Sequence, residues 1–222
     1  ATENPISTPK PLWSEQDPAD WWQGIQAAIR QVLADTGVSG QEVVAIGLTG
    51  QMHGLVLLDE AGEVLRPSIL WNDQRTGPQC EWMTETIGLD NLLAWTGSPA
   101  LTGFTAPKVL WVRDHEPDTY RQIAQILLPK DYVRFRLTGA YAADKAGGAG
   151  TVLFDLSTRD WSPELLEKPP RLYWRGYTYA SYSNYRWRAF SPNFDEFSPS
   201  EDVLLIPDLK DRITARFTIT TQ

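Results

Sequence analysis

Cysteine is nearly absent from this sequence, since Cys80 is the single cysteine among 222 residues. A lone cysteine excludes a disulfide within the chain, and chains without disulfides are typical of reducing compartments. We therefore expect a cytoplasmic protein. The first residues, Ala1 to Pro5, contain neither a basic segment nor an apolar one, so no signal peptide is predicted.

Long apolar runs and basic blocks are missing as well. No apolar stretch approaches the roughly 20 residues that cross a bilayer, so we expect no membrane segment. The net charge is −8 and Lys and Arg are not clustered, which argues against nucleic acid as a partner. Hydrophobic residues make up 42% of the chain, as in ordinary globular proteins that build a core.

Charge and aromatic content both change near Lys168. Residues 1–167 hold 12 Lys/Arg and 22 Asp/Glu, a net charge of −10, whereas residues 168–222 hold 8 and 6, a net charge of +2. Of the 25 aromatic residues, 11 lie in the second segment. We therefore predict an α/β unit over 1–167 followed by a β-rich, aromatic-rich tail over 168–222.

Helical and strand-like patterns alternate through the first segment. Asp17 as N-cap, Pro18 at the first position and Gly37 at the end predict a helix between them. Its apolar stripe is interpreted as packing surface and consists of Trp21, Trp22, Ile25, Ala28, Ile29, Val32 and Leu33. Further helices are expected near 76–87, 89–95, 108–113, 118–123 and 130–137, and strands near 43–49, 54–59, 64–65 and 126–128.

A polar pentapeptide, Gly50-Gln51-Met52-His53-Gly54, lies between two apolar runs that we interpret as buried strands. Loops at the carboxyl ends of strands in α/β sheets commonly bind ligands. The two glycines would let the backbone turn sharply, so that Gln51, Met52 and His53 face a cleft. The alternative is that His53 only caps the sheet while Met52 fills the core.

Asn72 and Asp73 follow another strand-like run and should reach the same kind of edge. They could equally turn the chain and cap the helix that begins near Thr76. Further along, Gly147, Gly148 and Gly150 form a glycine cluster before an apolar run. Such a cluster could cradle an anion with backbone N–H groups, and a flexible loop is the alternative.

The sequence pattern of the tail differs from that of residues 1–167. Pro169 and Pro170 end a helix that Ser162-Pro163 begins. Aromatic strands are expected over 172–179 and 185–187, and residues 213–219 alternate with the period of a strand, which together predict antiparallel β structure. Arg among aromatics could stack on bases or sugars, whereas a half-buried sheet face is the alternative.

Five stretches together resemble the FGGY family of carbohydrate kinases, in particular its xylulokinases. They are Trp13 to Pro18 with Trp21-Trp22, Gly50 to Gly54, Leu65 to Asp73, Gly103 to Lys108, and Leu127 to Tyr132. Their order and spacing match along residues 6–166, and the Met-His pair favours xylulokinases over glycerol kinases. The resemblance implies an actin-like, ribonuclease-H-like α/β fold in two domains with a cleft between them.

The resemblance also implies a reaction, in which the γ-phosphate of ATP is transferred to the 5-hydroxyl of D-xylulose with Mg²⁺. The residues that it places at or near the sugar are Gln51, Met52, His53, Trp71, Asn72 and Asp73. Lys130 and Asp131 would shape the cleft wall. A homodimer is implied as well.

The sequence departs from the family pattern at the catalytic base. The pattern before Gly150-Thr151 has an Asp that takes the proton of the sugar hydroxyl, and Gly147 stands at that position. Loss of a general base typically costs roughly 10²–10⁴-fold in rate. Asp144 also matches the family, and we interpret it as structural. The family's Asp-x-Gly-Thr-Ser phosphate loop and ATP-binding domain are not in this sequence, so we expect the chain by itself to be inactive.

The tail resembles a different protein. Residues 171–190 are weakly similar to a segment of transglutaminase-like membrane proteins, without the catalytic Cys, His and Asp. We interpret residues 168–222 as unrelated to the kinase segment, joined to it in a chimeric reading frame. Two alternatives stay open: a sugar-binding module without catalysis, and a chain whose identity lies in a β-rich envelope-type segment.

Overall fold

The computed structural model describes residues 3–166, 188–190, 203–205 and 214–219. Its helices are α1 (Pro18–Thr36), η1 (Gly40–Glu42), α2 (Gly77–Ile87), α3 (Leu89–Thr96), α4 (Thr105–His115), α5 (Pro117–Gln122), α6 (Pro129–Thr138), α7 (Lys145–Ala149) and α8 (Pro163–Leu166). Its strands are β1 (Glu15–Gln16), β2 (Ala45–Gly50), β3 (Val56–Leu58), β4 (Ser68–Ile69), β5 (Gln125–Leu127), β6 (Phe154–Asp155), β7 (Asp160–Trp161), β8 (Arg188–Phe190), β9 (Val203–Leu205) and β10 (Thr214–Ile219). The predicted boundary near Lys168 and the aromatic strands at 172–179 and 185–187 lie outside the described residues.

Helix α1 begins and ends where the sequence predicts. The Asp17 carboxylate accepts a hydrogen bond from the Ala19 N–H at 2.9 Å, and Pro18 needs no hydrogen-bond partner at the first position. Gly37 ends the helix with a left-handed φ of 68°, and its N–H donates to the Leu33 carbonyl.

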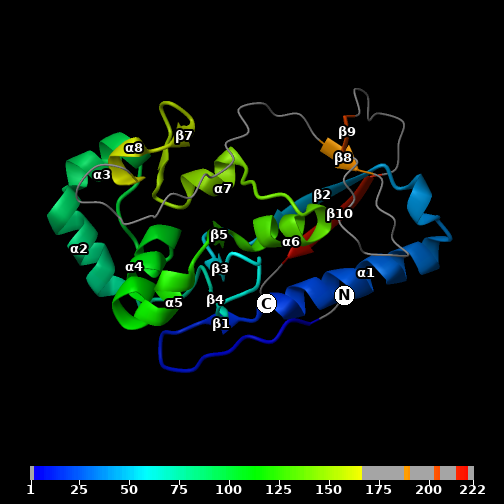
Figure 1. Cartoon of the computed structure of the whole chain (residues 1–222), viewed down its shortest axis with the longest axis horizontal. Helices are drawn as coiled ribbons and strands as arrows, with labels where there is room; N and C mark the ends of the chain where they lie inside the picture. The colour runs from blue at the N-terminus through cyan, green and yellow to red at the C-terminus, as the bar shows by residue number, and fades with distance from the viewer. Residues whose placement is uncertain (1–2, 167–187, 191–202, 206–213, 220–222) are drawn as a thin grey trace.

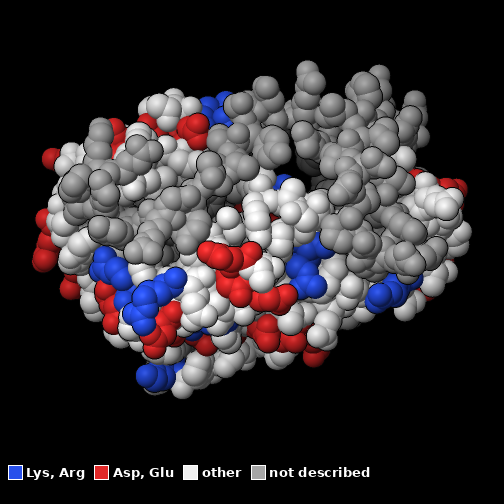
Figure 2. Space-filling model, viewed as in Figure 1, with Lys and Arg blue, Asp and Glu red and all other residues white. Residues whose placement is uncertain are grey.

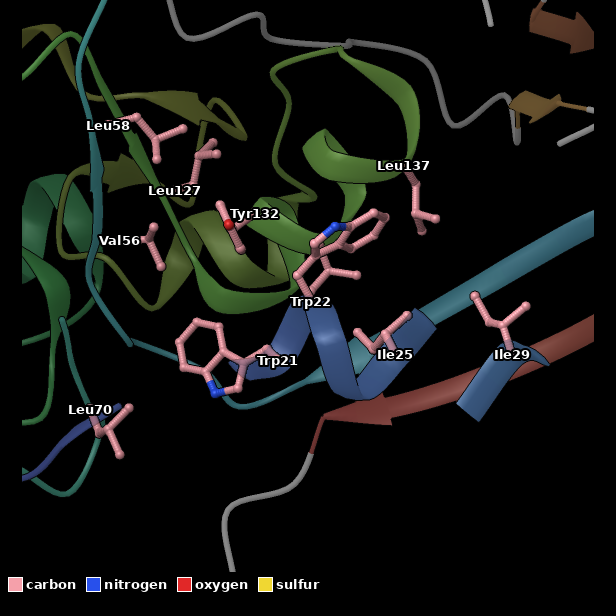
Figure 3. Packing of buried hydrophobic residues seen from close by; sticks show 11 residues of the cluster. Trp21, Trp22, Ile25, Ile29, Val56, Leu58, Leu70, Leu127, Tyr132 and Leu137 are labelled. Atoms are coloured by element: carbon pink, nitrogen blue, oxygen red, sulfur yellow. The ribbon is translucent and has the colours of Figure 1, made fainter. Parts of the chain in front are cut away.

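The main hydrophobic core lies between α1, α6 and the β3–β5 pair (Figure 3). Its buried members are Trp21, Trp22, Ile25, Ile29, Val56, Leu58, Leu70, Leu127, Tyr132, Val133 and Leu137. The predicted packing role of the two tryptophans is confirmed, because they are 1% and 8% exposed. Val32 departs from the predicted stripe, since it is 48% exposed, whereas Leu33 at the end of the stripe packs against the core.

The two strands that flank the pentapeptide do not pair with each other. β3 is fully buried and pairs antiparallel with β5, whereas β2 is mostly half-buried and pairs with β10. The expectation of two buried flanking strands is therefore wrong for β2. Figure 1 shows α2, α3, α4 and α5 gathered at one end of the molecule and β2, β10, α1 and α6 at the other.

The predicted strand at 213–219 is confirmed as β10. Its pairing is parallel, however, whereas antiparallel β structure was expected for the tail. β10 runs parallel to β2, with Thr214 opposite Ala45 and Ile219 opposite Gly50. Parallel strands need a long connection, and 163 residues separate the end of β2 at Gly50 from the start of β10 at Thr214. β8 and β9 do form an antiparallel pair.

The expected helices are all present near their predicted bounds, and Gly97 and Gly139 end α3 and α6 with left-handed φ. One α-helix was not expected: the glycine cluster forms the short helix α7 instead of a loop. Asp144 caps this helix by accepting a hydrogen bond from the Gly147 N–H at 2.8 Å. The Asp144 cap therefore stabilises a helical turn that glycines by themselves do not favour.

Charged side chains of both signs are interspersed over the described part of the face in Figure 2. Among the described helices, none combines the length and the apolar character needed to cross a bilayer.

A network of buried charges joins the start of the chain to the segment after β4. One oxygen of Glu15 lies 2.6 Å from Arg66 Nη2 and 2.7 Å from Arg75 Nη1. Arg75 also binds the carboxylate of Asp73, with Nη2 2.7 Å from Oδ2. The Arg75 guanidinium lies 3.7 Å from the ring centre of Trp13, which adds a cation–π contact. The carboxylate of Glu15 thus compensates two arginines that are shielded from water.

We expect Glu15→Gln to lower the free energy of unfolding by about 1.5–3 kcal/mol, because Arg66 and Arg75 lose the carboxylate that they share and each keeps a single partner, Glu116 and Asp73. Urea unfolding measures the change. Asp118→Asn is the matched control, since it removes an ion pair to Arg121 whose side chains are 69% and 85% exposed and should cost under about 1 kcal/mol. Equal effects of the two substitutions would contradict a stabilising role for the buried network.

Candidate functional site

The pentapeptide turns at His53, not at its glycines. His53 has a φ of 63°, in the left-handed region, whereas Gly50 and Gly54 are outside it. The prediction that the glycines make the turn is therefore wrong. Gly54 is required for a different reason, since a Cβ there would lie 2.6 Å from the Pro129 ring at the start of α6. A left-handed non-glycine residue costs about 1–3 kcal/mol and needs support from its surroundings.

The imidazole of His53 is held from two sides. Its Nδ1 lies 2.6 Å from the Gly150 carbonyl oxygen at the end of α7, and its ring packs edge-on against Phe104 with centres 4.7 Å apart. A carbonyl can only accept, so the proton is assigned to Nδ1, and Nε2 of the neutral ring is an acceptor. Burial lowers the pKa of His53 below 6.5; the Gly150 contact opposes this shift and Lys108 adds to it.

The other two polar positions of the loop differ in exposure. Met52 is 61% exposed, so it does not fill the core, and that alternative is wrong. Gln51 is half-buried, and its Nε2 lies 3.4 Å from Oε1 of Gln16, the oxygen that also accepts from Trp21 Nε1. Gln51 Oε1 is buried and has no hydrogen-bond partner. A buried acceptor without a partner is costly, so Oε1 of Gln51 is available to accept a hydrogen bond from a water or a ligand.

The stretch after β4 divides into exposed and buried parts. Trp71 is 46% exposed and Asn72 is exposed, whereas Asp73 is fully buried. The carboxylate of Asp73 accepts from Arg75 and from the Ser14 N–H at 2.7 Å. Asn72 and Asp73 do turn the chain, but no side chain caps α2. Asp73 therefore braces the segment that presents Trp71 and Asn72.

Lys108 connects the loops of the site, a role that the sequence analysis missed. Its Nζ donates to the carbonyls of His53 at 3.0 Å and Gly103 at 2.7 Å. Gly103 in turn packs against the Trp71 backbone, since a Cβ there would lie 3.0 Å from the Trp71 oxygen. The sequence offered two signals: Lys108 begins an apolar helical run, and it ends the family-like stretch Gly103 to Lys108. The loops that contain His53, Gly103 and Trp71 are thus brought together around one ammonium group.

Gly147, where the resemblance leads us to expect the family's base, lies beside an ion-pair cluster. Lys130 pairs with Asp131 and with Asp144, and a Cβ on Gly147 would lie 3.1 Å from Lys130 Nζ. Burial alone would lower the pKa of Lys130, but the two carboxylates outweigh it and raise the pKa. Gly147 accepts through its carbonyl from the Gly150 N–H, so it lies one turn from the carbonyl that holds His53.

We found no group of three or more His, Cys, Asp and Glu placed to hold a metal ion within the described residues.

Gly150→Ala tests the close contact between α7 and His53. A Cβ at Gly150 would lie 2.5 Å from Cε1 and 2.6 Å from Nδ1 of His53. We expect displacement of the ring and a loss of about 1–3 kcal/mol in the free energy of unfolding. Gly77→Ala is the control, because nothing lies within 4 Å of a Cβ there, and it should be neutral or slightly stabilising. Urea unfolding together with the NMR signals of His53 checks both, and an unchanged His53 signal in Gly150→Ala would contradict the contact.

Comparison with known proteins identifies the family of this chain. Residues 1–168 match the N-terminal domain of the FGGY family of carbohydrate kinases. The chain is 48% identical to xylulose kinase of Escherichia coli (strain K12) over 162 residues, which is 73% of this chain and 33% of that protein. It is 46% identical to xylulose kinase of Bacillus subtilis (strain 168) over 161 residues, which is 72% of this chain and 32% of that protein.

Solved structures give the same result. A crystal structure of a xyloylose kinase from Brucella ovis matches with a TM-score of 0.70 and 43% identity, covering 73% of this chain and 33% of that one. Xylulose kinase from Rhodospirillum rubrum matches with a TM-score of 0.68 and 28% identity, covering 72% and 33%. The chain thus spans a third of the length of these relatives, and the expected actin-like α/β fold is confirmed. This chain belongs to the FGGY family of carbohydrate kinases.

Proposed function

We propose that this chain binds the ketopentose D-xylulose, as the sugar-binding part of an ATP-dependent kinase of the xylulokinase type. The relatives that it matches at 48% and 46% identity are xylulose kinases, which supports the choice of sugar. ATP as phosphoryl donor, Mg²⁺ as its counter-ion and a homodimeric assembly belong to the proposal for the whole kinase.

The observation that carries the proposal is the state of His53. Its ring is half-buried, neutral and oriented by Gly150, so Nε2 presents a lone pair in a fixed direction. A sugar hydroxyl is a matching donor. Gln51 Oε1, which lacks a partner, is a second acceptor for a hydroxyl. We assign the sugar contacts to Met52, His53 and Gln51.

The segment after β4 completes the proposed pocket. The exposed indole of Trp71 offers an apolar face to the C–H side of a sugar, and Asn72 offers an amide that can both donate and accept. Asp73 contributes by bracing this segment through Arg75. We propose that Lys130 and Asp131 form the adjoining wall, where their ion pair is largely shielded from water.

We expect His53→Ala to weaken binding of D-xylulose by about 2–13-fold, the loss that corresponds to one hydrogen bond of about 0.5–1.5 kcal/mol. Isothermal titration calorimetry measures this loss. His115→Ala is the control, because His115 is the second histidine of the chain and stacks on Trp111 away from the pentapeptide.

The pH dependence of binding follows from the lowered pKa of His53. At pH 6.5 an ordinary histidine is half protonated, whereas His53 stays mostly neutral and keeps its acceptor. Affinity should therefore fall only as the pH drops through the lowered pKa, below 6.5.

No binding by the wild-type chain, or unchanged binding by His53→Ala, would overturn the proposal.

The same chain should bind the sugar without phosphorylating it. Gly147 supplies no proton acceptor at the position that the family resemblance assigns to the general base, and the neighbouring Asp144 is engaged with Lys130 and with the Gly147 N–H. This observation favours a binding module over an active kinase. We also propose that residues 168–222 are unrelated in origin to the kinase segment, even though β10 pairs with β2.

We expect no turnover above background when D-xylulose, ATP and Mg²⁺ are supplied to the chain in a coupled ADP-release assay. The reason is the missing base, whose loss lowers rates by roughly 10²–10⁴-fold. Turnover at an ordinary kinase rate, about 1–100 s⁻¹, would contradict the assignment of Gly147 to the base position.

A further inference from the structure

Lys108 is a buried charge that the proposed sugar chemistry does not use. It is 0% exposed and lies one turn into α4, between apolar neighbours. Its Nζ donates to two backbone carbonyls, those of His53 and Gly103, and both belong to loops rather than to helices. Burying an ammonium group is costly unless its N–H groups are hydrogen-bonded, so the placement of Lys108 calls for a specific explanation.

The carbonyl that Lys108 binds belongs to the residue with the least favourable backbone in the pentapeptide. His53 has a φ of 63°, and the hydroxyl of Thr105 donates to the same carbonyl at 3.1 Å. Two donors from the first turn of α4 therefore converge on the oxygen of this left-handed residue. They compensate the cost of that conformation and fix the direction of the peptide that carries the imidazole.

We propose that Lys108 is a positioning residue for His53, holding the His53 and Gly103 carbonyls so that the imidazole stays on Gly150 and Nε2 points toward the sugar. Lys108 does not touch the sugar itself. This inference deepens the proposed function and rests on it for the identity of the ligand. The orientation of His53 can, however, be measured without any sugar.

Several charged and titratable groups face the ammonium. Burial lowers the pKa of Lys108 to about 7; the Asp73 carboxylate and the Cys80 thiol act against this shift, and Arg75 adds to it. His53 faces it from the pentapeptide. The folded pKa is below the ordinary 10.5, so between pH 7 and 10.5 the unfolded chain binds more protons. The contribution of Lys108 to stability therefore rises with pH across that window.

Histidine NMR tests the proposal directly, because the chain holds only two histidines. In the ¹⁵N-histidine-labelled 222-residue chain without sugar, we expect His53 to show a single Nδ1–H tautomer. In Lys108→Met we expect signals of both tautomers for His53 and unchanged signals for His115. Wild-type signals of His53 in this variant would overturn the proposal.

Val112→Ala is the matched control. It removes buried volume one turn further along the same helix and lies among other partners, so it lowers stability without touching the His53 carbonyl. We expect it to retain the single tautomer. Loss of the tautomer in Val112→Ala as well would show a general effect of instability and would also overturn the proposal.

A second measurement needs only the wild-type chain, in case Lys108→Met does not fold. The backbone ¹³C carbonyl shifts of His53 and Gly103 should titrate together, with the same midpoint as Lys108 Nζ. Midpoints that differ from that of Lys108, or carbonyl shifts that do not move, would overturn the proposal.

Calorimetry then connects the position of His53 to binding. Lys108→Met should weaken D-xylulose affinity by about 2–13-fold, as His53→Ala does, and the double variant should lose little more than either single one. Fully additive losses would overturn the proposal. If the wild-type chain binds no D-xylulose, the proposed function fails, while the tautomer and titration results still decide the role of Lys108.

Discussion

The contact between the Lys108 ammonium and the His53 carbonyl is the interaction on which the arrangement of the site depends. It connects helix α4 to the one residue of the pentapeptide with a left-handed backbone, and through Gly103 it reaches the segment that begins at Trp71. Because the ammonium is fully buried, its hydrogen bonds act in a low dielectric and are strong. The site is therefore built from loops that a single charged group orders.

Charge balance extends from this point through the protein interior. Asp73 faces Lys108 and binds Arg75, Arg75 binds Glu15, and Glu15 also binds Arg66. Each carboxylate compensates a cation that burial would otherwise disfavour. This chain of contacts explains why Asp73, which the sequence suggested as a residue near the sugar, faces inward while its neighbours Trp71 and Asn72 face solvent.

Local signals predicted the helices well and the strand partners poorly. Asp17, Pro18 and Gly37 are sufficient to define α1, because capping and proline act on the nearest residues. The pairing of β2 with β10 and of β3 with β5 joins segments far apart in the chain, which no local pattern encodes. The glycine cluster misled for a different, local reason: the cap from Asp144 outweighs the flexibility of Gly147 and Gly148.

By itself, the sequence determined the α/β class and the helix ends, because these depend on residue types at short spacing, and it determined the family through the order of five short stretches. It also singled out His53, and it showed a glycine where the resemblance calls for a base. Only the tertiary structure decided that His53 makes the turn, that Gly150 sets its tautomer and that Lys108 supports its carbonyl. Those facts depend on contacts between residues 55 to 97 positions apart, which arise when the helices pack.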